Sequence, residues 1–280
     1  MSPFRLIQCV LGKTYSFVNR SGFLETKLGR KLFRSSYFFY KEVFEDPFSN
    51  LLKKHPEFFR DGDVLDIGAN IGYTATLFSR GLDKDFFVHA FEPEPKNFTQ
   101  LSEIVKNAVG GSQIRPVQTA VGDSFGTIEF WRNTNLHADH RTVTDDFKTL
   151  LKAQDKASEI ISVPVTSVDS YLDARDKKTP ISFIKIDVQG YEEAVCRGMT
   201  ETLKSNPRAV VALEYCPSEM NELGFSKSGV FSFFEKLNYN MWLIEKNGDL
   251  SKITMEEVDE LVRERRYVDF LFKKEVFENG

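Results

Sequence analysis

The chain has 280 residues, of which 41% are hydrophobic, and a formal net charge of −4 at pH 7. Its length and composition allow a full core in one large domain, or one domain with a cap, and its acidic balance gives no general attraction to nucleic acid. No segment approaches the run of about 20 apolar residues that crosses a bilayer, and the three separated cysteines form no C-x-x-C pair, so we expect a soluble, cytoplasmic protein without a disulfide framework.

Residues 1–60 form the first predicted unit, an N-terminal helical arm. Its first 41 residues carry eight basic side chains and one acidic side chain, and aromatic residues are dense, above all in the run YFFY at 37–40. Such a large apolar surface is unfavourable in water, so the arm must pack on something. We expect a cap over the substrate side of the acidic main domain. A glycan, a peripheral membrane contact and a homo-oligomer contact remain alternative partners.

From Asp61 onward, short apolar runs alternate with stretches of helical periodicity, which is typical of βαβ units. A helix is expected to open at Pro95 and to end near Ala108, and the stretch 127–131 is expected to close a hairpin across Gly122–Gly126. An amphipathic helix is predicted over 190–204, and Thr254 and Glu257 form a capping box for a later helix. The predicted strands are 64–67, 86–91, 114–121, 127–131, 162–168, 183–188, 210–213, 241–244 and 267–272.

These elements predict one α/β domain over residues 61–280. We expect it to be Rossmann-like and doubly wound, with a mostly parallel, seven-stranded sheet. Residues 133–161 interrupt the alternation with a polar insertion that contains His137, Asp139 and His140. Because substrate loops of such folds lie beside the carboxyl ends of the strands, we expect this insertion on the substrate side.

The turn from Asp66 to Gly72 follows a strand and opens a helix, which is the context of a nucleotide site. The dinucleotide fingerprint G-x-G-x-x-G fails here, because Asp66 and Ile71 stand where it needs glycine. A carboxylate at this turn repels a pyrophosphate but suits a cationic ligand such as S-adenosylmethionine, which carries a sulfonium and an ammonium. Gly68 and Gly72 permit close backbone approach, and Asn70 tolerates the left-handed conformation.

Glu92 ends the second predicted strand and is followed by Pro93, which removes a backbone donor. An acid at this place accepts hydrogen bonds from both hydroxyls of a ribose, as in dinucleotide-binding folds. Asp66 and Glu92, at the ends of two successive strands, therefore predict a nucleoside cofactor.

Five blocks in this order, DIGANIGYTATLFS, HAFEPEPKNFTQL, TAVGD, VPVTSVDSYL and FIKIDVQGYEEAVCRGM, resemble the FkbM family of class I S-adenosylmethionine-dependent methyltransferases over roughly residues 60–245. The resemblance implies methylation of a hydroxyl on a sugar, a glycan or a small natural product. It implies that the first block binds the methionyl part, the second the ribose and the third the adenine. The cofactor-binding residues so implied are Asp66, Gly68, Ala69, Asn70, Gly72, Glu92, Ala120 and Val121.

Asp187 takes the position that faces the transferring methyl group in the resembled family. The family usually reads D-V-E-G at this point, whereas this chain has Gln189. Glu192 and Glu193, one turn along, are possible substitutes for the missing acid.

An alcohol must lose its proton as it is methylated, so a base within hydrogen-bond reach assists the reaction. The candidate catalytic residues are Asp187, His137 and His140. A metal site formed by the two histidines with Asp139 and Asp187 is an alternative that no recognised ligand spacing supports, so we expect no metal. A nicotinamide-dependent oxidoreductase and a non-catalytic cofactor-binding module remain the alternative functions.

Overall fold

The computed structural model describes residues 29, 38, 46–108, 110–132, 141–145, 147–149, 160–265 and 267–275. The chain divides into two compact units, Met1–Asp46 and Pro47–Gly280, and every element below belongs to the second. Nearly all of the first unit lies outside the described residues, so the cap over the substrate side stays a prediction. Within the described part, no helix is long and apolar enough to cross a bilayer.

Residues 47–60, which the sequence analysis assigned to the arm, form helix α3 (Phe48–Lys54) and the 3-10 helix η3 (Pro56–Phe59) of the second unit. Phe48 and Phe59 are buried in its core, where the Phe59 ring lies 4.5 Å from that of Phe183. The core of this unit therefore begins before residue 61.

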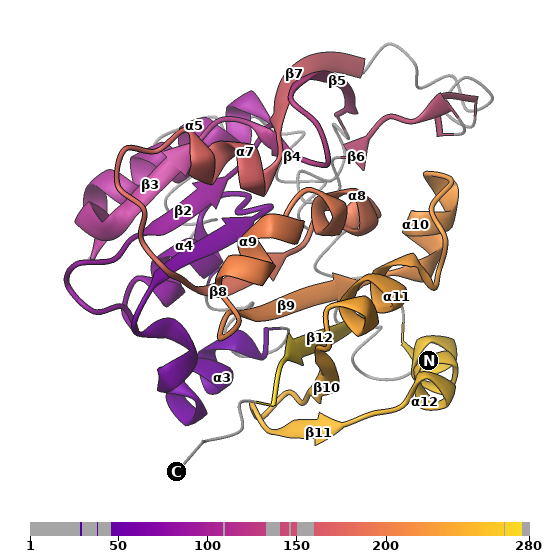
Figure 1. The fold of residues 1–280 in the computed structure, drawn as a ribbon. Helices are drawn as coiled ribbons and strands as arrows, with labels where there is room; N and C mark the ends of the chain where they lie inside the picture. The colour runs from indigo at the N-terminus through magenta and orange to yellow at the C-terminus, as the bar shows by residue number, and fades with distance from the viewer. Residues whose placement is uncertain are drawn as a thin grey trace. The chain divides into compact units, whose positions relative to one another are not determined.

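The main sheet has eight strands in the order β11-β10-β12-β9-β8-β1-β2-β3 (Figure 1). The five strands from β9 to β3 run parallel, while β12, β10 and β11 pair antiparallel at the other side. This arrangement confirms the predicted α/β, mostly parallel sheet. The strands are β1 (Asp63–Ile67), β2 (Val88–Phe91), β3 (Ile114–Val117), β8 (Ile181–Ile186), β9 (Val210–Tyr215), β10 (Asn240–Ile244), β11 (Leu250–Lys252) and β12 (Val268–Lys273).

The predicted number of seven strands was one too low, because β11 was missed. This strand has three residues, none of them fully buried, and pairs only with β10. It is formed by a turn at Gly248, whose φ is 83°, and not by an apolar run of its own. A strand this short leaves no alternation to read in the sequence.

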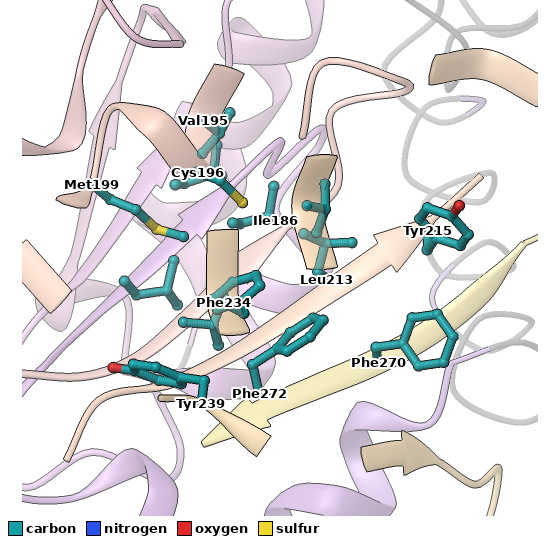
Figure 2. Packing of buried hydrophobic residues seen from close by; sticks show 14 of the residues in the cluster. Ile186, Val195, Cys196, Met199, Leu213, Tyr215, Phe234, Tyr239, Phe270 and Phe272 are labelled. Atoms are coloured by element: carbon teal, nitrogen blue, oxygen red, sulfur yellow. The ribbon is translucent and has the colours of Figure 1, made fainter. Parts of the chain in front are cut away.

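Helices cover both faces of the sheet, which confirms the doubly wound architecture. On one face α3, α4 (Tyr73–Phe78) and α5 (Pro95–Asn107) enclose one hydrophobic cluster. On the other face a larger cluster packs against α7 (Val168–Asp173), α8 (Glu192–Arg197), α9 (Thr200–Ser205), α11 (Gly229–Lys236) and α12 (Met255–Glu264). The larger cluster, part of which Figure 2 shows, includes the Phe234 and Phe272 rings, which stack at 3.8 Å. The predicted capping box of Thr254 and Glu257 is present at the start of α12.

A second sheet of four strands follows β3, and it corrects two predictions. Its strands, in the order β4-β7-β5-β6, are β4 (Ala120–Val121), β7 (Ile160–Thr166), β5 (Gly126–Trp131) and β6 (Arg141–Thr142). The predicted strand 114–121 is thus divided between two sheets, with a bend at Thr119, whose hydroxyl donates to the carbonyl of Pro164 at 3.0 Å. The expected hairpin does not form, because β7 lies between β4 and β5 and pairs with both.

The predicted helix over 190–204 is two helices, α8 and α9, with a break at Gly198. A Cβ at Gly198 would lie 1.9 Å from the carbonyl oxygen of Gly122, so this backbone contact needs glycine. Asp169 caps α9, the second of these helices, by accepting a hydrogen bond from the amide of Thr202 at 2.8 Å. The apolar face was predicted correctly, since Val195 and the later members of the stripe are buried.

Candidate functional site

The turn after β1 adopts the conformation that its glycines and asparagine predict. Gly68, Asn70 and Gly72 all have positive φ, of 83°, 50° and 91°. The amides of Gly68 and Ala69 donate to the carbonyl of Phe91 at 3.1 and 2.9 Å, which fixes the turn beside the end of β2. A Cβ at Gly68 would lie 1.8 Å from the carbonyl oxygen of Asp187. The turn therefore packs closely on the segment that follows β8.

Glu92 joins this turn to the end of β2. Its Oε2 accepts from the Asn70 amide, and its Oε1 accepts from the Glu94 amide, both at 2.9 Å. The side chain is buried, and this burial raises its pKa to about 8. Each carboxylate oxygen has a second lone pair, so Glu92 can still accept hydrogen bonds from a ligand.

Asp66 lies at the same edge and is fully buried. Its Oδ2 accepts from the Thr74 hydroxyl at 2.7 Å, and its Oδ1 lies 3.7 Å from the Lys185 ammonium. Burial raises the pKa of this carboxyl group, and the nearby ammonium opposes the shift. The Lys185 ammonium neutralises the buried Asp66 carboxylate only in part, so a cationic ligand beside it is favoured.

Lys185, like Glu214, is a charged residue of this site that no sequence pattern singled out. It lies on β8 in register with Asp66 on β1, and its ammonium is 3.0 Å from Oδ2 of Asp187. Burial alone would lower the pKa of Lys185, but the carboxylates of Asp187 and Asp66 raise it. The available signal was a lysine inside an otherwise apolar strand, FIKI, directly before an aspartate.

Asp187 and Glu214 follow the last register pair of β8 and β9, in which Ile186 faces Leu213. Gln189 lies between the two acids, and its amide nitrogen donates to Asp187 Oδ1 at 2.9 Å and to Glu214 Oε1 at 3.3 Å. At the carboxyl ends of β8 and β9, the side-chain amide of Gln189 therefore joins two carboxylates.

Glu192 and Glu193, the possible substitutes for the missing acid, are both engaged elsewhere. Glu192 is buried, and its Oε1 accepts from the amides of Val188 and Gly190 at 3.2 and 3.1 Å. Burial raises the pKa of Glu192 to about 7. Glu193 pairs with Arg197 at 2.7 Å. These contacts give the two acids structural roles.

The residues predicted near the adenine, Ala120 and Val121, form β4 and are buried. The Ala120 side chain packs in the small core of the second sheet, and that of Val121 packs in the large cluster of the main sheet. Their side chains are thus committed to packing, and their role toward an adenine stays a prediction.

His137 and His140 lie outside the described residues, as does Asp139. Among the residues that are described, no group of three His, Cys, Asp or Glu side chains is arranged to hold a metal ion. Within the insertion, Arg141 on β6 is described, and it donates to Glu219 at 3.2 Å and to Glu222 at 2.5 Å. Both acids belong to α10 (Pro217–Glu222), which follows β9.

The loop 187–190 is also adjacent to α10. A Cβ on Gly190, whose φ is 102°, would lie 2.7 Å from the backbone of Glu219. Helix α10 therefore contacts both β6, a described part of the predicted insertion, and the loop that carries Asp187.

Comparison with known proteins identifies relatives of this arrangement. A family model described as the methyltransferase FkbM domain matches residues 66–241. The hexuronic acid methyltransferase AglP of Haloferax volcanii is 28% identical over 182 residues, which cover 64% of this chain and 67% of AglP.

Two solved structures are also similar. Methyltransferase FkbM from Methylobacillus flagellatus has 15% identity and a TM-score of 0.45, and the match covers 76% of this chain but only 44% of that longer chain. The O-methyltransferase TomG from Streptomyces achromogenes, solved in complex with S-adenosylmethionine, has 15% identity and a TM-score of 0.44 over 81% of this chain and 78% of its own. At these scores the fold assignment rests on the strand order described above.

Proposed function

Because the chain belongs to the FkbM family of methyltransferases, we propose that it transfers a methyl group to a hydroxyl oxygen of a sugar or glycan. Its cofactor is S-adenosylmethionine, the methyl donor of that family. The observation that carries the proposal is the group of acids at the carboxyl edge of β1, β2 and β8, where Asp66, Glu92 and Asp187 meet around one tight turn. The relative named for hexuronic acid supports a sugar as the acceptor.

The charges at this edge fit a cationic donor. Lys185 is one cation close to the carboxylates of Asp66, Asp187 and Glu214, so negative charge is in excess. A sulfonium and an ammonium reduce that excess, whereas the pyrophosphate of a nicotinamide cofactor adds to it. This argument disfavours the alternative oxidoreductase.

We assign the binding of the methionyl part to Asp66 and to the turn residues Gly68, Ala69, Asn70 and Gly72. The ribose is assigned to Glu92, which is already fixed by two backbone amides. Ala120 and Val121 are assigned to the adenine. A preformed, hydrogen-bonded acid loses little freedom when it binds a diol, which favours affinity.

The bound donor supplies an electrophilic methyl group, whose bond to sulfur breaks as the acceptor oxygen attacks. The electron pair of that bond stays on sulfur, and the proton of the acceptor hydroxyl must leave. Asp187 is the proposed base, because its side chain is partly accessible and lies next to the turn that holds the donor. Orientation by the surrounding residues supplies much of the remaining rate enhancement.

His137 and His140 are second candidates for the base, on the insertion that leads into Arg141. Their proposed role rests on the polar composition of the insertion and on its attachment to α10. If either histidine takes part, its replacement lowers turnover and leaves cofactor affinity intact. A double variant with normal turnover would assign the insertion a structural role alone.

The test is a screen of acceptors with S-adenosylmethionine labelled in its methyl group. The panel contains a glucuronide, a neutral glucoside and a catechol, and mass spectrometry locates the label. We expect label on a ring hydroxyl of a sugar, and no transfer by an Asp187→Asn variant. Label on the uronic carboxylate or only on the catechol would contradict the sugar hydroxyl as acceptor, and absence of transfer to any panel member would contradict the proposed function.

A further inference from the structure

The Asp187 and Glu214 side chains are placed by the alternation of residues along two neighbouring strands of the main sheet. On β8, Phe183 and Lys185 alternate on the face that α4 and α5 cover, and Asp187 follows the strand at the next position of this alternation. On β9, Ala212 and Glu214 alternate on the same face. Since β8 and β9 are parallel neighbours, Asp187 and Glu214 leave the same face at the same edge. Two carboxylates at such positions repel each other unless a donor lies between them.

Gln189 supplies that donor. Both of its neighbours are carboxylates, which accept hydrogen bonds but donate none when ionised, so the amide nitrogen must face them. Its two N–H groups suffice for one bond to each acid. A glutamine therefore satisfies both carboxylates without adding a charge.

The backbone at Gln189 is held in a conformation that few such residues adopt. Its φ is 56°, in the left-handed region that glycine and asparagine favour. Glu192 stabilises this turn by accepting the amides of Val188 and Gly190. Strain that the surrounding contacts maintain in this way is common at functional sites. Here it directs the Gln189 side chain between the two acids.

We propose that Gln189 is a positioning residue that bridges Asp187 and Glu214 and keeps both carboxylates ionised beside the acceptor. The inference deepens the proposed function and rests on it for the identity of the reaction. The acceptor oxygen forms its bond to the methyl carbon, the carbon–sulfur bond breaks, and the hydroxyl proton passes to the carboxylate pair. With an amide as the bridge, neither carboxylate has to hold a proton before the reaction begins.

The charged groups around the pair come from four elements of the structure. Lys185 on β8 lies 3.0 Å from Asp187 and 3.7 Å from Asp66 on β1. Glu192 on α8 accepts a hydrogen bond from the amide of Val188 in the loop 187–190, and Asp269 on β12 is in register with Glu214. Among the groups of the described residues named here, acids outnumber the cation, so a third carboxylate between the pair is expected to take up a proton.

The proposal is tested by replacing Gln189 with residues of nearly the same size. Gln189→Glu adds the third carboxylate, and Gln189→Met removes the bridge without adding charge. Gln100→Glu, on α5, is the matched control for the same change of charge. Carbon-13 NMR of the Asp and Glu carboxyl groups gives their titration without any acceptor, and Asp187→Asn and Glu214→Gln assign the two signals.

In the wild-type protein we expect the Asp187 and Glu214 signals to stay ionised throughout the neutral range. In Gln189→Glu, one carboxyl of the cluster should titrate more than about one pH unit higher, as expected for acids that share a proton. In Gln189→Met, the loss of the bridge should raise the titration of one of the pair in the same direction. Unchanged titration of both signals in Gln189→Glu, as in Gln100→Glu, would overturn the bridge.

The second readout is the pH profile of methyl transfer to the acceptor found by the labelled screen. Gln189→Glu should move the acid limb of the kcat profile to higher pH by the shift that NMR measures, while Gln100→Glu should not. Equal profiles for the two variants would overturn the role in catalysis. Absence of transfer by the wild-type protein would instead contradict the proposed function, and the NMR titration would still decide whether Gln189 forms the bridge.

Discussion

Replacing Lys185 with methionine should destabilise the protein far more than the removal of an exposed lysine. Lys185 is buried, and its ammonium lies 3.0 Å from Asp187 and 3.7 Å from Asp66. At an effective dielectric constant of about 20, each attraction is on the order of 5 kcal/mol. Desolvation of the buried ions offsets several kcal/mol of this sum, so a net loss of about 3–5 kcal/mol of unfolding free energy is expected.

The control is Lys204→Met. Lys204 lies 2.7 Å from Glu201, but the two side chains are 55% and 70% exposed. Because solvent screens such pairs, its loss should cost about 0–1 kcal/mol. The two variants thus separate the effect of burial from that of distance, since the shorter ion pair is predicted to be the weaker one.

The cost of Lys185→Met should also depend on pH. Burial already raises the pKa of Asp66 above its unfolded value, and without the ammonium that opposes this shift the native pKa rises further. The destabilisation is then complete at pH values above the native pKa and is relieved as the pH falls through it, because the carboxylate becomes protonated. Urea unfolding near pH 8 and near pH 5 measures both effects. A cost equal to that of Lys204→Met, or one that is the same at both pH values, would refute the reasoning.

Four further predictions use other parts of the structure. Gly68→Ala should cost at least about 1–3 kcal/mol in urea unfolding, since φ is positive there and the new Cβ meets the Asp187 carbonyl; a neutral result would contradict the described turn. Glu92→Ala should weaken S-adenosylmethionine binding by about 1–3 kcal/mol in calorimetry. In the wild type, affinity should increase as the pH rises through about 8 and Glu92 ionises, and a flat profile equal to that of the alanine variant would contradict the ribose assignment. Arg141→Met should cost about 3–5 kcal/mol by removing a buried charge partner of Glu219, and unchanged stability would show that β6 is held by other contacts. Deleting residues 1–40 should retain cofactor binding but lose most methyl transfer, and full activity of the truncated chain would contradict the cap.

The conformation of the turn after β1 could be predicted from the sequence because its determinants are local. The turn from Asp66 to Gly72 needs positive φ at particular positions, and the residues that tolerate it are visible in the sequence. Glu92 is likewise placed by the end of its own strand. The strand–turn–helix pattern and the apolar periodicity were enough to infer a doubly wound sheet.

The contacts of Lys185, Gln189 and Glu214 join segments that are distant in the chain, and no local sequence pattern indicates them. Lys185 meets Asp66 only because β1 and β8 are neighbours in a particular register. Gln189 bridges to Glu214 only because β9 lies beside β8. The hairpin across Gly122–Gly126 was wrongly predicted for a similar reason, because β7 comes from a later part of the chain and pairs between β4 and β5.

Turnover and cofactor affinity of an Asp187→Asn variant, measured side by side, test the central claim most directly. The claim is that the donor held by Asp66 and Glu92 meets its acceptor beside Asp187. With the acceptor identified by the labelled screen, kcat should fall by about 10²–10⁴ through loss of the base, while the dissociation constant for S-adenosylmethionine stays close to that of the wild type. Wild-type turnover in this variant would contradict the claim.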